Sequence, residues 1–220
     1  MGAALLFIFN LKDISCNIVY IFKLKLINMK TLKIEIEGIV PLLLCNNRMS
    51  NPLDPEAKEH KKVSGKRKKT DEDYEWLARH EWLMALYVNK DGDVIIPDVM
   101  LEASITNGAK ESRKGKQFQS GFMVPEPAKL KNPNTGRYYK LDTIQDDPNH
   151  IDIRSVRIQR ATIMRARPIF TEWSLAFDAQ YDESIIDIGE IKDAIRVAGT
   201  MKAIGDYRPK FGRFRIVSIN

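Results

Sequence analysis

The residues best suited to contacting a ligand lie near the end of the chain, in segment 205–215. This segment holds two glycines, four basic residues and three aromatic residues. Glycine lets the backbone approach a ligand closely, basic side chains neutralise phosphates, and aromatic rings stack on bases. The pattern therefore predicts a nucleic-acid-contacting loop, with a surface hairpin whose aromatic residues anchor in the core as the alternative. The predicted contact residues, including one on the preceding helix, are Lys202, Gly205, Arg208, Lys210, Gly212 and Arg213.

A second basic group lies in segment 151–168, where five arginines occur within fourteen residues. The surrounding residues have β character, so strand alternation would place several arginines on one exposed sheet face. The planar guanidinium group can bind phosphate through two parallel N–H donors, which favours a contact role. The alternative is a solvated face that forms ion pairs with Glu172 and Asp178. The arginines are Arg154, Arg157, Arg160, Arg165 and Arg167.

Two further stretches are basic. Residues 110–150 form a proline-rich segment that begins with Lys110, Arg113 and Lys114, and we interpret it as an irregular partner-binding arm with one short strand near residues 121–124. Residues 46–70 read as a flexible loop carrying a basic run at 58–69. Such a run is usually a solvated segment, and a nucleic-acid role is the alternative.

The chain offers little for catalysis or metal binding. His60, His80 and His150 are scattered, and Cys16 and Cys45 are too few for a zinc site or a disulfide framework. We find no nucleophile motif or paired carboxylates in the sequence. We therefore expect no enzymatic activity, no cofactor and no metal.

Composition sets the remaining bounds. The 220 residues can form one domain with insertions, and a formal charge of +6 with a pI near 9.2 favours a polyanionic partner. Low cysteine content fits a reducing cytoplasm. Residues 1–28 are apolar but interrupted by charges, which makes a poor membrane span or signal peptide. We interpret them as a mis-assigned extension, with Met29 as the natural start and 29–220 as a single domain with insertions at about 46–96 and 110–150.

The elements that would position these residues can be read from periodicity. Alternating apolar residues predict strands at 31–37, within 155–181 and at 213–219, with Trp173, Leu175 and Phe177 facing a core. Helices are expected at 98–109 and 188–203, and Thr70 with Asp73 predicts a further helix start. Residues 89–93 suggest a hairpin turn between two short strands. The main elements give an α+β fold with a ferredoxin-like (RRM-like) β-α-β-β-α-β core and long insertions.

At three places the chain resembles the RAMP superfamily of CRISPR effector proteins, especially the backbone subunits that coat guide RNA. Residues 34–42 are similar to the family's first strand and its Pro-Leu step. Residues 95–103 are similar to its apolar-proline entry into a small-residue helix, and residues 205–214 lie where the family keeps a glycine-rich loop. The resemblance implies an RNA-contacting role for Gly205, Arg208, Lys210 and Gly212.

The same resemblance likens Asp54 to a loop aspartate with which some backbone subunits cleave target RNA, and an ordinary Asp-Pro turn is the alternative. We therefore expect a non-catalytic, self-associating protein that binds single-stranded nucleic acid, with RNA favoured, and that assembles with other effector subunits. A CRISPR antiviral complex or a phage or mobile-element relative would be its setting, away from membranes. A phage structural or assembly protein and a single-strand annealing protein remain the alternatives.

Overall fold

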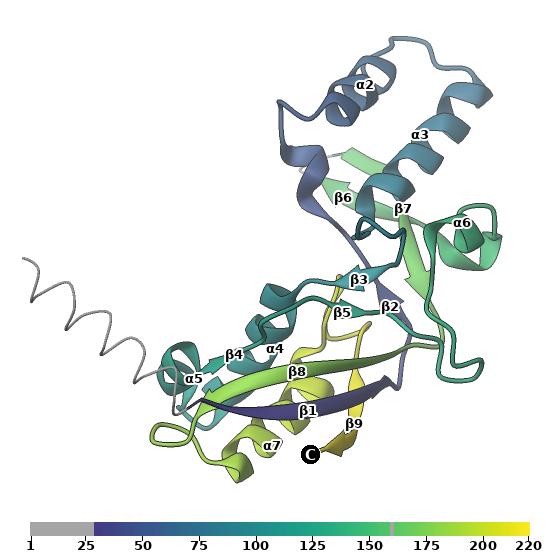
Figure 1. The fold of residues 1–220 in the computed structure, drawn as a ribbon. Helices are drawn as coiled ribbons and strands as arrows, with labels where there is room; N and C mark the ends of the chain where they lie inside the picture. The colour runs from purple at the N-terminus through teal and green to yellow at the C-terminus, as the bar shows by residue number, and fades with distance from the viewer. Residues whose placement is uncertain (1–28, 159–160) are drawn as a thin grey trace, which may run out of the picture.

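The computed structural model describes residues 29–158 and 161–220. The interpretation of residues 1–28 as an extension, and the placement of Arg160, therefore lie outside the described residues. The molecule has two ends (Figure 1): a four-stranded sheet with helices against it at one end, and a β-hairpin with helices against it at the other. The segment around β2 (Leu42–Leu43) runs between them.

The four-stranded sheet contains β1 (Met29–Gly38), β4 (Phe122–Met123), β8 (Ser174–Asp182) and β9 (Phe214–Ile219), in the order β4-β8-β1-β9 with antiparallel neighbours. Its strands form because apolar residues alternate with polar ones, so that one face can be buried. In β1, for example, Leu32, Ile34 and Ile36 are buried. The predicted core side of Trp173, Leu175 and Phe177 is confirmed, since all three are buried.

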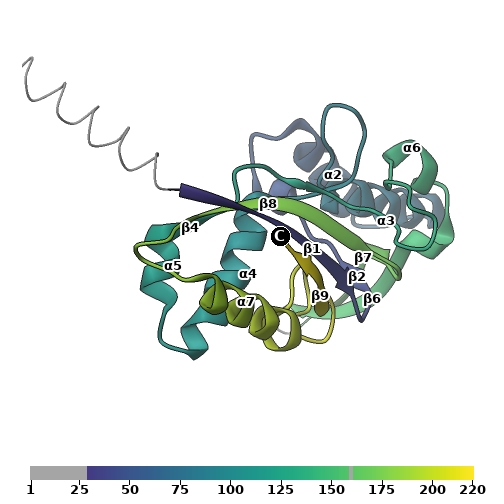
Figure 2. The same ribbon diagram turned by 60° about the horizontal axis from the view of Figure 1, so that its bottom comes forward.

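Helices α4 (Asp98–Glu111) and α7 (Ile188–Val197) lie on the same side of this sheet (Figure 2). They approach closely because α4 presents a glycine: a Cβ built on Gly108 would lie 2.2 Å from the Ala194 carbonyl oxygen. Gly108 therefore permits the close packing of α4 on α7. A single helix was predicted for residues 188–203. In the structure its α-helical part ends at Val197, and a π-helical segment, η3 (Ala198–Lys202), follows directly.

The strand order and the two helices give the predicted β-α-β-β-α-β arrangement in an α+β fold. The assignment of its second strand was wrong. That strand is the two-residue β4, whereas β6 (Ile151–Ile158) and β7 (Ala161–Phe170) form a separate sheet with β2, in the order β2-β7-β6. The sequence pattern favoured β6 and β7 because they have eight and ten residues of clear β character, whereas β4 has only two.

Two helices pack at the hairpin end, α2 (Pro55–Ser64) and α3 (Asp71–Ala85). The predicted start of α3 is confirmed, because Thr70 and Asp73 form a reciprocal capping box. The flexible loop predicted for 46–70 was wrong in part: it contains η1 (Asn47–Ser50) and all of α2. Asp54 caps α2 and Pro55 occupies its first turn, a helix start that was interpreted as a simple turn.

The remaining segments are more regular than expected. The turn at 89–93 is confirmed by a bridge between Val88 and Val94, but β3 (Ile95–Ile96) pairs with β5 (Ala128–Lys129). Segment 110–150 also contains α5 (Gly115–Gly121), α6 (Leu141–Ile144) and η2 (Pro148–His150), so it is not the irregular arm that was predicted. Among the described helices, none combines the length and the apolar character needed to cross a bilayer.

Candidate nucleic-acid interface

The hairpin places its arginines on both of its faces. Arg154 pairs directly with Arg165 across the strands, and Arg167 lies opposite Asp152, so these three arginines share one face. Arg157 is exposed on the other face, opposite Thr162. The shared face is not the open surface that the sequence suggested, because each of its three arginine side chains is at most 29% exposed.

Each arginine on this face has an acidic partner, and none of these partners was predicted. Arg154 pairs with Asp152, whose carboxylate raises the pKa of Arg154, while Arg167 pairs with Asp206. Arg165 pairs with Glu81 of α3. The alternative, ion pairs with Glu172 and Asp178, is therefore not what these three arginines form. Asp152 could have been found from the sequence, because it stands two residues before Arg154 on the same strand face.

Arg165 differs from the other two because its partner belongs to the packing of the helices. Glu81 is buried and also accepts hydrogen bonds from the Ala166 backbone N–H at 3.3 Å and from His60 Nε2 at 3.2 Å. Burial by itself would raise the pKa of Glu81, but these bonds and Arg165 hold that pKa below its ordinary value of 4.5. Arg165 thus attaches α3 to the hairpin.

The glycines of loop 205–212 are required by the fold. Gly205 and Gly212 have φ of 78° and 72°, and their Cβ atoms would lie 2.3 Å from the Leu43 oxygen and 1.8 Å from the Ile204 oxygen. The loop is fixed to the β2 segment, since the Asp206 N–H donates to Leu43 and the Gly212 N–H to Pro41, both at 2.8 Å. The glycines therefore permit close approach to the chain itself, where the sequence suggested approach to a ligand.

Loop and hairpin meet at a group of four side chains, which we call the arginine–aromatic cluster: Arg154, Arg167, Tyr207 and Phe211. The Arg154 Cζ lies 4.6 Å from the Phe211 ring centre and 5.3 Å from that of Tyr207. The Arg167 Cζ lies 5.4 Å from the Tyr207 ring centre. These are cation–π distances. The two segments predicted independently to contact nucleic acid are thus neighbours in space, and Tyr207 stays 40% exposed.

Beside the cluster lies a concavity of about 550 Å³, which we call the loop hollow. Tyr207 forms part of its wall, so the hollow continues directly from the cluster. Three predicted contact residues line it, namely Lys110 from α4, Lys202 from η3 and Arg208 from the loop. Lys202 pairs with Glu111, and the Lys110 Nζ donates to the Asn107 side chain at 2.8 Å. Lys110 and Lys202 are therefore already oriented by neighbours, and two acidic residues, Glu111 and Asp206, also line the hollow.

The other predicted contact residues lie outside the cluster and do not line the hollow. Lys114, in the turn between α4 and α5, pairs with Glu190 of α7. Arg113 is exposed after the end of α4. Lys210 is exposed on the loop, and Arg213 is half-buried beyond it, where its carbonyl oxygen accepts the Ile39 N–H at 2.9 Å. Tyr207 and Phe211 were noted in the sequence as stacking rings but were not singled out as contact residues.

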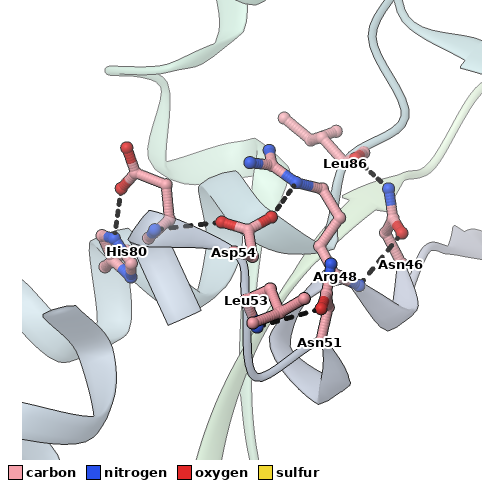
Figure 3. Close-up of polar contacts among 8 residues, drawn as sticks. Asn46, Arg48, Asn51, Leu53, Asp54, His80 and Leu86 are labelled. Atoms are coloured by element: carbon pink, nitrogen blue, oxygen red, sulfur yellow. Dashed lines mark hydrogen bonds and ion pairs between the residues drawn. The ribbon is translucent and has the colours of Figure 1, made fainter. Parts of the chain in front are cut away.

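Asp54 has a defined role in the fold (Figure 3). One carboxylate oxygen accepts the Glu56 backbone N–H at 3.0 Å, which caps α2, and the other accepts Arg48 Nε at 3.1 Å. Burial of the carboxyl group opposes these contacts, yet together they hold the pKa of Asp54 below its ordinary value. The helix cap accounts for this residue better than the simple Asp-Pro turn.

Comparison with known proteins gives a similarity of fold. No protein-family model matches the sequence, and no curated protein matches it. A solved structure that does match is a chain of a type III-B Cmr-β complex, determined by cryo-EM bound to cognate target RNA. The TM-score is 0.55 at 9% sequence identity, and the match covers 95% of this chain. This chain spans 66% of the length of that one, so the two share a fold while differing in extent.

Proposed function

We propose that this protein is an RNA-binding subunit of a CRISPR-type effector complex, of the RAMP kind that coats a guide RNA. The observation that carries the proposal is the convergence of loop 205–212 with the arginine hairpin. It brings stacking rings, guanidinium groups and a basic hollow onto one continuous surface. The similarity of fold to a chain of an RNA-bound Cmr complex supports the same assignment.

In this proposal the cluster binds the bases of a single strand and the hollow binds its phosphates. Exposed Tyr207 offers a ring on which a base stacks, and the hollow offers Lys110, Lys202 and Arg208 to the adjoining phosphates. The acidic partners hold Arg154 and Arg167 against the rings, which makes those arginines supports for the stacking surface rather than free phosphate ligands. Binding of this kind reads the backbone and is largely independent of sequence.

The proposed role is binding without catalysis. Asp54, which the family resemblance would nominate for cleavage of target RNA, uses both carboxylate oxygens within the fold. Self-association and contacts with other subunits belong to the proposal as well, since an effector backbone is built from repeated copies. A phage assembly protein with no nucleic acid is the alternative to be tested against it.

Size-exclusion chromatography of the full chain tests the proposal, with absorbance followed at 260 and 280 nm. We expect a large species that carries RNA of defined length, which RNase removes and DNase does not. A species free of nucleic acid, whether monomer or closed oligomer, would contradict the proposal and favour a structural protein.

A further inference from the structure

The helices α2 and α3 face each other through two pairs of carboxylate and imidazole groups. His80 Nε2 lies 2.8 Å from a Glu56 oxygen, a contact drawn in Figure 3, and His60 Nε2 lies 3.2 Å from a Glu81 oxygen. The two imidazole rings stack with their centres 5.8 Å apart. Trp76 also stacks on His80, with ring centres 4.4 Å apart.

The two pairs differ in what surrounds them. The Glu81 carboxylate is shared with Arg165 and the Ala166 N–H, so its bonding capacity is used within the fold. Glu56, in contrast, is joined by a second carboxylate one turn later on α2, because Glu59 follows it by three residues. Donor atoms of Glu56, Glu59 and His80 all lie within 4.8 Å of one another.

His80 also has unused bonding capacity. The residue is 8% exposed, and within residues 29–158 and 161–220 its Nδ1 atom is buried with no hydrogen-bond partner. The nitrogen that faces the Glu56 carboxylate is Nε2, so an ion bound among the three side chains would replace the hydrogen bond between Nε2 and Glu56. The unpartnered Nδ1 would then be left to a water molecule, because buried polar atoms nearly always have a partner. The Glu59 side chain likewise makes no hydrogen bond or ion pair with the part of the chain that the structure describes.

We propose that Glu56, Glu59 and His80 form a binding site for a divalent transition-metal ion, for which Zn²⁺ is the probe. Two carboxylates and one imidazole supply charge and mixed oxygen and nitrogen ligands, a set that suits Zn²⁺ better than Ca²⁺ or Mg²⁺. Three protein ligands leave a coordination position for water. Movement of the exposed glutamate side chains is sufficient to close the three ligands around an ion.

Such an ion would fix α2 to α3 at the hairpin end of the molecule. Because α3 carries Glu81, which holds Arg165 of β7, metal binding would also steady the helices against the arginine hairpin. The site is distinct from the arginine–aromatic cluster, since none of its three residues belongs to the cluster or lines the loop hollow. The proposal therefore stands or falls independently of RNA binding.

Titration of the chelator-treated full chain with Zn²⁺ by calorimetry tests the site, together with the visible absorption of bound Co²⁺ and the change in Tm. Glu59→Gln removes one ligand without removing a contact of the fold, and Glu75→Gln removes an exposed carboxylate of α3 as the matched control. We expect about one equivalent bound with a rise in Tm, and an affinity at least about tenfold weaker in E59Q but unchanged in E75Q. Absence of binding, or equal affinity in wild type and E59Q, would overturn the proposal. Circular dichroism of E59Q confirms that the fold is retained.

Discussion

The salt dependence of RNA binding should fall by a defined amount when the loop hollow loses its three basic side chains. The triple variant Lys110→Gln, Lys202→Gln and Arg208→Gln removes the three basic side chains that line the hollow. Each phosphate contact to a single strand contributes about 0.7 to the slope of log affinity against log salt, so the slope should become shallower by about 2. Between 50 and 200 mM salt, the wild type should then lose about 20-fold more affinity than the variant.

Fluorescence anisotropy with a labelled single-stranded RNA measures both slopes. The matched control is Lys33→Gln, Lys90→Gln and Lys192→Gln, which removes the same formal charge from exposed positions elsewhere. The control should keep a slope close to that of the wild type, with a modest loss of affinity from weaker long-range attraction. Equal slopes for the wild type and the hollow variant, or equal reductions in both variants, would refute the placement of phosphates in the hollow.

Three further predictions concern stability. Gly108→Ala should lower the free energy of unfolding in urea by about 1–3 kcal/mol, because its Cβ would strike the Ala194 carbonyl of α7; an unchanged midpoint would contradict the close helix contact. Asp54→Ala should cost about 0.5–2 kcal/mol of unfolding free energy through the lost cap of α2 while leaving RNA affinity unchanged, and a selective loss of RNA affinity would show that Asp54 belongs to the interface. The folded state holds the pKa of Glu81 below 4.5, so its ionised contacts stabilise the protein above that pH and are lost as pH falls through the folded-state pKa. The Tm of the wild type should therefore fall more steeply below pH 4.5 than that of Glu81→Gln, and parallel Tm profiles would contradict this role.

The sequence predicted best where a local rule decides the structure. Alternation of apolar residues predicted β1 and the core side of Trp173, and the pairing of Thr70 with Asp73 predicted the start of α3. Both depend on residues within a few positions of one another. The start of α2 also follows a local rule, because Asp54 is a capping residue and Pro55 lies in the first turn. It was missed because the surrounding lysines and prolines were interpreted as a flexible loop.

Long-range contacts were beyond such rules. The short strand predicted near residues 121–124 is confirmed as β4, but its place as the second strand of the core depends on its pairing with β8, because two residues carry no periodicity of their own. Arg154 and Tyr207 contact each other in the cluster although β7, β8 and α7 lie between them in the sequence. Glu81, which pairs with Arg165, belongs to a separate helix, α3. The sequence identified two basic segments, and the three-dimensional packing determined that they meet and which acids neutralise them.

Photo-crosslinking of the full chain to single-stranded RNA that contains 4-thiouridine, followed by peptide mass spectrometry, tests the proposed interface most directly. We predict crosslinks at Tyr207 and Phe211, with neighbouring adducts on peptides from β6 and β7. Crosslinks confined to the sheet face lined by Lys33, Glu35 and Asp178, on the strands β1 and β8, would contradict it. So would the absence of crosslinks from residues 205–212 in a protein that nevertheless binds RNA.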